Sequence, residues 1–111
     1  MTLKPEQFTE QAQYVLRYSQ ELVHRYKHGQ WDVEHIVLAI LELGDGLTEA
    51  IFSELHISMQ AARSRLAVLL EAAPKVSEDV SQLYTTPRVQ RLLEDSGAEA
   101  KRLRDAFIGV E

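Results

Sequence analysis

An internal repeat constrains the fold of this 111-residue chain more than any other feature of its sequence. When the sequence is shifted by 77 positions, an amphipathic helix predicted to start after Thr9 falls on one predicted to start after Thr86. Both threonines are good N-caps, and the two apolar stripes coincide except where Leu22 meets Glu99. Such self-similarity predicts one complete helical repeat followed by a fragment of a second. The aligned pairs are Ala12 with Val89, Val15 with Leu92, Leu16 with Leu93, Ser19 with Ser96, Val23 with Ala100, Tyr26 with Leu103, Val33 with Val110 and Glu34 with Glu111.

The rest of the sequence also has helical periodicity outside residues 73–84, and no segment alternates with period two for long enough to predict a strand. Gly29 is suited to follow the end of the first helix, Ser58 to cap a fourth, and Pro87 to start a fifth that runs to about Arg104. The apolar run 36–41 predicts a second helix in the middle of the fold. The sequence therefore predicts an all-α fold. The inward faces expected are Leu47, Ile51 and Leu55 on a short third helix, and Ala62, Leu66, Leu69 and Leu70 on the fourth.

The length corresponds to one small domain, which we divide into residues 1–72 as a first repeat, 73–84 as a linker and 85–111 as the start of a second repeat. The second copy stops where its second helix should begin. We therefore expect either a gene product that continues beyond Glu111 or a truncation. Exposed apolar faces drive association, so we expect a homo-oligomer through the fifth helix, or packing of that helix on the first repeat, through Leu92, Leu93 and Leu103.

Charge and composition exclude several functions. The net charge of −5 argues against nucleic acid and against a membrane as partners. Because cysteine is absent, disulfides and thiolate metal sites are excluded. Gly44 and Gly46 lack the following Lys-Ser/Thr of a phosphate-binding loop, and no serine lies in a G-x-S-x-G motif. The N-terminus lacks the apolar region of a signal peptide. We expect a cytoplasmic protein with no catalytic residues and no cofactor.

Several short motifs resemble the Clp N-terminal repeat. The strongest is DVEHIVLAI at 32–40, which is similar to the G-T-E-H-L-L-L-A-L signature. The order and spacing of the motifs extend the resemblance from Phe8 to Glu111. The others are FTEQA at 8–12 for the F-T-x-x-A opening, GDG at 44–46 for the E-G-x-G turn, LHIS at 55–58 for the L-G-V-S joint, YTTPR at 84–88 for the F-T-P-R-A start of the second repeat, and FIGVE at 107–111 for the second signature.

The resemblance implies a Clp N-domain-like helical bundle, with one complete four-helix repeat and the first helix of a second, pseudo-symmetric repeat. In that family the domain precedes the ATPase modules of an AAA+ unfoldase, receives protein substrates or adaptor proteins, and hydrolyses nothing itself. The implied partners are unfolded or tagged substrates, adaptors and the AAA+ modules of the parent chain. The alternative is a standalone helical module for protein interaction or dimerisation.

The resemblance also implies a site for peptides or phosphoarginine. In ClpC-type domains the signature glutamate is implicated in recognising phosphoarginine, and its positions here are Glu34 and Glu111. Both lie at predicted helix N-termini, where the helix dipole favours a carboxylate, so helix capping is the alternative. Val33 replaces the signature threonine and Asp32 adds negative charge, so we expect weaker phosphoarginine binding. The candidate site residues are Thr9, Val33, Glu34, Thr86, Val110 and Glu111.

Three further features favour structural interpretations over functional ones. His24 and His28 have the helical spacing of a shared zinc site, but the pattern favours an exposed, solvated helix face. His35 is interpreted as a structural histidine that bonds a neighbouring backbone carbonyl. Trp31 and Phe107 precede the second helices of the two copies, and we expect them to pack in the core rather than to line a groove.

Overall fold

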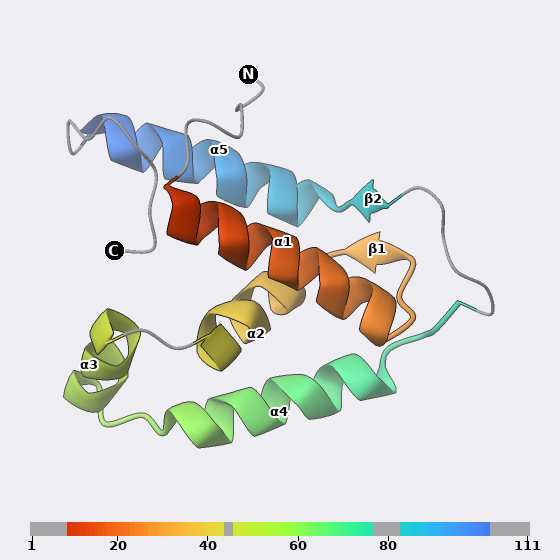
Figure 1. The fold of residues 1–111 in the computed structure, drawn as a ribbon, viewed down its shortest axis with the longest axis horizontal. Coiled ribbons are helices and arrows are strands. Elements are labelled where there is room, and N and C mark those ends of the chain that lie inside the picture. The colour runs from red at the N-terminus through yellow and green to blue at the C-terminus, as the bar shows by residue number, and fades with distance from the viewer. Residues whose placement is uncertain (1–8, 44–45, 77–82, 103–111) are drawn as a thin grey trace.

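The computed structural model describes residues 9–43, 46–76 and 83–102. Helix α2 lies in the middle and packs against α1, α4 and α5, while a short strand pair joins the chain before α2 to the chain before α5 (Figure 1). The all-α prediction is confirmed. The helices are α1 (Glu10–Arg25), α2 (Val33–Leu43), α3 (Gly46–Glu54), α4 (Met59–Ala72) and α5 (Pro87–Arg102), and the strands are β1 (Gln30–Trp31) and β2 (Tyr84–Thr85).

The repeat is visible in the helices themselves. Helices α1 and α5 have 16 residues each, and both bounds of α5 lie 77 positions after those of α1. The hydroxyl of Thr9 accepts a hydrogen bond from the backbone of Ala12, as the hydroxyl of Thr86 accepts one from Val89. Both capped partners are buried. The described part of the second copy therefore repeats the capping and the first buried position of the first copy.

The end of α1 differs from the sequence prediction. The helix stops at Arg25, and Lys27 reverses the chain with φ of 59°. Its amide bonds the carbonyl of His24, and the amide of His28 bonds the carbonyl of Val23, the two bonds of a Schellman cap. Gly29, the residue expected to follow the end of the helix, instead allows a close approach of Val76, whose Cγ1 would lie 3.1 Å from a Cβ at this position.

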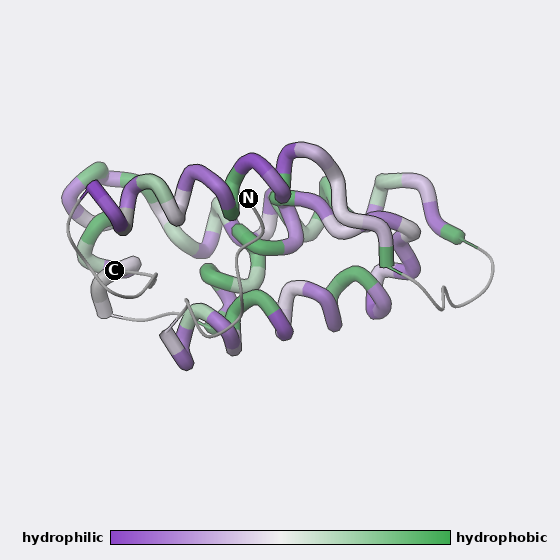
Figure 2. Tube along the Cα trace, turned by 90° about the horizontal axis from the view of Figure 1, so that it is seen from above, coloured by the Kyte–Doolittle hydropathy of each residue, from purple (hydrophilic) through white to green (hydrophobic). Residues whose placement is uncertain are grey.

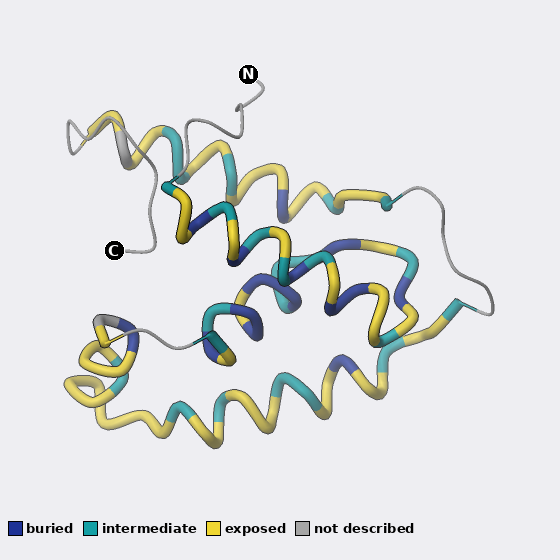
Figure 3. Tube along the Cα trace, in the orientation of Figure 1, coloured by how far each residue is buried: buried dark blue, intermediate teal, exposed yellow. Residues whose placement is uncertain are grey.

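The core lies between α1, α2, α4 and α5. Buried residues gather along α1, β1 and α2, as the dark segments of Figure 3 show. Trp31 is buried as expected, and its indole nitrogen donates a 2.9 Å hydrogen bond to the hydroxyl of Ser19. The prediction of a central second helix is confirmed, although Val37 on its outer side is exposed.

Strands β1 and β2 are the element that the periodicity did not predict. They pair in parallel, with Gln30 opposite Tyr84 and Trp31 opposite Thr85. The amide of Thr86 extends the pairing through a bond to the carbonyl of Trp31. Two residues are too few to show a period of two, so the pairing depends on tertiary contact rather than on local pattern.

The predicted inward faces of the third and fourth helices are partly wrong. Ile51 and Leu55 are exposed, at 48% and 60% of their surface, and Leu69 is exposed at 58%. Leu70 is buried as expected, and Leu66 is half-buried. Hydrophobic residues recur along α4 (Figure 2), but α2 covers one narrow side of the helix, so most of its surface stays open (Figure 3). Of the other predicted positions, the side chain of Leu47 and residue Leu103 lie outside the described part of the chain.

Candidate functional site

The N-terminus of α2 carries two carboxylates, and Asp32 is the one that caps the helix. Its Oδ1 accepts hydrogen bonds from the amide of Val33 at 2.7 Å and from the hydroxyl of Thr86 at 3.1 Å. The carboxylate thus satisfies an otherwise free N–H of α2 and connects that helix to the cap of α5. Val33 is half-buried and packs against the core.

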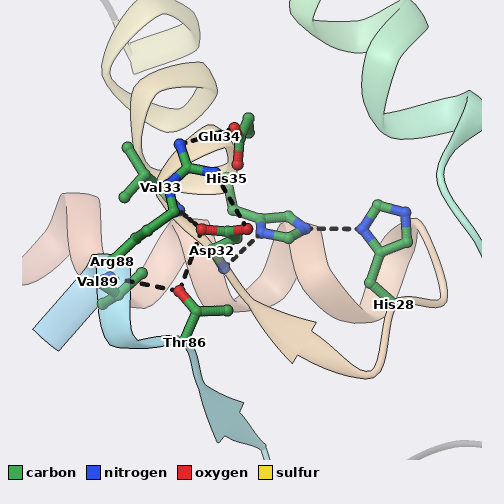
Figure 4. A network of polar contacts seen from close by, with 8 residues as sticks. All are labelled: His28, Asp32, Val33, Glu34, His35, Thr86, Arg88 and Val89. Carbon is green, nitrogen blue, oxygen red and sulfur yellow. Dashed lines mark hydrogen bonds and ion pairs between the residues drawn. The ribbon is translucent and has the colours of Figure 1, made fainter.

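Glu34 faces a guanidinium of its own chain, as Figure 4 shows. The Nη2 atom of Arg88 lies 2.9 Å from Oε1 of Glu34, and its Nη1 atom lies 3.6 Å from Oδ2 of Asp32. The hydrogen bond to Glu34 is the main cause that raises the pKa of Arg88. The side chain of Arg88 is 60% exposed, whereas those of Asp32 and Glu34 are 29% and 32% exposed. One arginine therefore bridges both carboxylates from α5.

Sequence reasoning missed Arg88, although a signal was present. Arg88 lies in the first turn of α5, which has no acidic residue. A cation at this position opposes the helix dipole, so a specific partner is expected for it. The carboxylates at the start of α2 are that partner.

The structure brings together only part of the predicted site. Of the predicted residues, Glu34 and Thr86 both lie at the start of α2, where Thr86 bonds the added carboxylate of Asp32, whereas the hydroxyl of Thr9 makes a local bond that caps α1. Val110 and Glu111 lie outside the described residues, as does Phe107, so their roles remain predictions.

A cavity of about 570 Å³ opens beside the two carboxylates. It lies between the start of α2 and the end of α4, and its size is that of a ligand pocket. Its wall on the α2 side is polar and acidic, and its wall on the α4 side is largely apolar. The lining residues are His28, Gly29, Gln30, Asp32, Glu34 and His35 on the first side, and Leu69, Leu70, Ala73, Pro74, Lys75 and Val76 on the second.

His28 and His35 meet at this cavity, and both differ from their predicted environments. His28 follows α1 rather than lying on it, and it is 6% exposed rather than solvated. The helical spacing with exposed His24 is therefore lost. His35 does not bond a carbonyl through its ring: its Nδ1 accepts from the amide of Asp32 at 3.0 Å, and its Nε2 lies 2.8 Å from Nδ1 of His28. In the described ranges, no group of three or more potential ligands could hold a metal ion.

A family described as the Clp repeat (R) N-terminal domain matches residues 7–111 of the chain. The chain belongs to this Clp N-terminal domain family. The curated relatives of this Clp N-domain include the chaperone protein ClpB of Bacillus cereus, 33% identical over 108 residues, and ClpB 1 of Synechocystis sp., 36% identical over 107 residues. The matches cover 95% and 96% of this chain but 12% of either relative. The chain thus spans a small part of the proteins that it matches.

Solved structures of Clp N-domains have the same fold. The N-terminal domain of the ClpV1 ATPase from E. coli superposes with a TM-score of 0.82 at 19% identity, covering 94% of this chain and 63% of that one. The N-domain of ClpV from Vibrio cholerae gives 0.78 at 11% identity, covering 97% and 66%. Among the described residues, no helix of this Clp N-domain is long and apolar enough to cross a membrane.

Proposed function

We propose that this Clp N-domain docks protein substrates or adaptor proteins for an ATP-dependent unfoldase and takes no part in catalysis itself. Membership of the Clp N-terminal domain family supports the proposal. The AAA+ modules of a parent chain are its expected partners. Deletion of this segment from such a parent should impair substrate delivery and leave ATP hydrolysis intact, and a lost ATPase activity would contradict the docking role.

The cavity has one acidic wall and one apolar wall, and this combination supports the docking role. Glu34 and Asp32 line one side of the cavity, and Leu69 and Pro74 line the other. A carboxylate binds a planar guanidinium through parallel hydrogen bonds. The site therefore suits a peptide segment with an arginine next to an apolar residue, with Glu34 as the main contact.

The same kind of contact already exists within the chain, because the guanidinium of Arg88 lies between the carboxylates of Glu34 and Asp32. An incoming guanidinium has to displace Arg88 or share Glu34 with it. The 60% exposure of the Arg88 side chain makes displacement feasible. We expect a bare arginine to be preferred over phosphoarginine, because Asp32 repels a phosphoryl group and Val33 offers no hydroxyl to it.

Titration of arginine, phosphoarginine and a short arginine peptide tests the site, with circular dichroism to confirm folding. Glu34→Gln should weaken binding of the arginine peptide by about ten- to a hundredfold, since hydrogen bonds between charged groups have this strength. Arg88→Gln should strengthen binding several-fold, about as expected for removal of a competitor.

Arg102→Gln is the matched control, because Arg102 is also an exposed arginine of α5 but pairs locally with Glu99 at 2.7 Å. The Arg102→Gln variant should bind the arginine peptide with the same affinity as the wild type. Unchanged affinity in Glu34→Gln would contradict the proposed site and leave Glu34 as a carboxylate that stabilises the start of α2.

A further inference from the structure

His28 and His35 form a buried pair that the proposed docking does not use. They are 6% and 3% exposed, and Nδ1 of His28 lies 2.8 Å from Nε2 of His35. The rings meet edge to face, with centroids 5.0 Å apart and planes at 66°. Imidazoles change charge near neutral pH, so the protonation of a buried pair has structural consequences.

The neighbours of the pair determine where its protons lie. The carbonyl oxygen of Leu70 can only accept, so Nε2 of His28, 2.8 Å away, donates to it. At the other end, the amide of Asp32 donates to Nδ1 of His35, which therefore carries no proton. A neutral His35 then holds its proton on Nε2 and donates it to Nδ1 of His28. The donors thus follow one direction, from the start of α2 toward the end of α4, and Figure 4 shows the bonds from Asp32 to His28.

The bond from His28 to Leu70 satisfies a carbonyl near the C-terminal end of α4. In a continuing helix the carbonyl of Leu70 would accept from residue 74, which is a proline and has no N–H. The amide of Ala73 contacts it at 3.3 Å, and His28 supplies the second donor. Leu70 is also the buried residue of this helix, at 4% exposure. His28 therefore attaches the end of α4 to the rest of the fold.

A further proton has no place in this chain of hydrogen bonds. If it binds Nδ1 of His35, it meets the amide hydrogen of Asp32. If it binds Nδ1 of His28, it meets the hydrogen on Nε2 of His35. Two donors face each other in either case, and an unmatched buried donor is costly. Protonation must therefore separate one of the contacts that hold the pair.

Carboxylates on the α2 side favour the protonated form of His35, but they do not remove the clash between the two facing donors. Burial is the largest cause that lowers the pKa of His35, and the neighbouring His28 lowers it further. Asp32 and Glu34 act in the opposite direction. Arg88 neutralises part of their charge from α5.

The groups on the other side of the pair are balanced in charge. Tyr26 stacks on His28 with ring centroids 5.8 Å apart, and burial raises the pKa of this phenol, so it stays neutral near pH 6. The ammonium of Lys75 lies 5.6 Å from the centre of the Tyr26 ring and 3.5 Å from a carboxylate oxygen of Glu71 on α4. Lys27 is exposed.

We propose that His28 and His35 form a proton-sensitive latch between α2 and the end of α4. At neutral pH the latch holds residues 69–76 as one wall of the cavity. Acidification separates the rings, so the end of α4 keeps its bond to His28 but loses its link through His35 to α2, and that wall loosens. The unfolded chain takes up the proton near the usual imidazole pKa of 6.5, whereas burial lowers the pKa of His35 in the folded chain. Stability is therefore full above pH 6.5 and falls as the pH drops from 6.5 toward the lowered pKa of His35.

Nitrogen NMR of the wild-type chain tests the proton positions directly. At pH 7.5 we expect the Nε2 atom of each ring to carry its proton, as the hydrogen-bond partners require. Amide hydrogen exchange tests the consequence, because the amides of Ala73 and Val76 bond the carbonyls of Leu70 and Lys27. Exchange there, corrected for its intrinsic pH dependence, should be faster at pH 5.5 than at pH 7.5, because opening of the wall is favoured once the pair takes up a proton.

His28→Gln is the decisive variant, because its amide oxygen can accept from His35 and its amide nitrogen can donate to Leu70 without titrating. It should respond less to pH than the wild type, because one of the two imidazoles is gone and the bond to Leu70 is kept, whereas His24→Gln, which removes an exposed histidine, should behave like the wild type. An Nδ1-protonated histidine in the pair, or an equal response to pH in wild type and His28→Gln, would overturn the proposal. If His28→Gln does not fold, the nitrogen spectra of the wild type decide.

Discussion

Lys27 adopts a backbone conformation that side chains of L-residues rarely take. Its φ is 59°, and the residue is exposed, so its side chain contributes little that would offset the strain. Lys27→Gly should raise the free energy of unfolding by about 0.5–1 kcal/mol, because glycine enters this region without a steric penalty. Urea denaturation measures the change. Lys27→Ala serves as the control and should leave stability nearly unchanged; a gain equal to that of glycine would refute the strain argument.

Ser19 is fully buried and has two partners. Its hydroxyl donates to the carbonyl of Leu16 at 2.6 Å and accepts from the indole of Trp31 at 2.9 Å. Ser19→Ala should cost about 1–3 kcal/mol of stability, because the indole N–H remains buried without an acceptor. In a double-mutant cycle with Trp31→Phe, the loss from Ser19→Ala should be smaller in the phenylalanine background. Additive losses would show that the bond contributes nothing.

At the scale of elements, the two threonine caps differ in what they connect. Thr9 caps α1 alone, whereas Thr86 caps α5 and also donates to Asp32 at the start of α2. Loss of a cap costs about 1 kcal/mol, and Thr86→Ala removes the additional bond between elements. Thermal unfolding should therefore show a lower midpoint for Thr86→Ala than for Thr9→Ala. Equal midpoints would mean that the bond to Asp32 does not stabilise the packing of α5 on α2.

At the scale of the whole molecule, apolar side chains remain exposed on more than one helix. Val68 and Leu69 on α4 are 68% and 58% exposed, and Leu92 on α5 is 36% exposed. Contiguous exposed apolar surface promotes association. We expect sedimentation of the 111-residue chain to depend on concentration. Leu69→Lys should weaken association if α4 forms the contact, and Leu92→Lys should do so if α5 does. A monomer at every concentration would contradict the expectation of a homo-oligomer.

Local patterns in the sequence were enough to predict the helices and the repeat of α1 in α5. The signals are local: threonine caps and the proline at the start of α5 mark where helices begin, and apolar stripes with helical spacing mark their buried faces. The repeat of α1 in α5 and the central place of α2 follow from the same patterns. The Glu34 position also came from a local motif.

Tertiary structure alone decided which side chains meet. Arg88 and Glu34 are 54 positions apart, and His28 and Leu70 are 42 apart, so no periodicity links them. A strand of two residues has no readable pattern, and the exposure of Leu69 depends on which side of α4 is covered by α2. Hydrogen bonds, ion pairs and burial depend on which helix faces come into contact when the chain folds. Local sequence patterns predict each helix, but which faces meet is decided only when α2, α4 and α5 pack together.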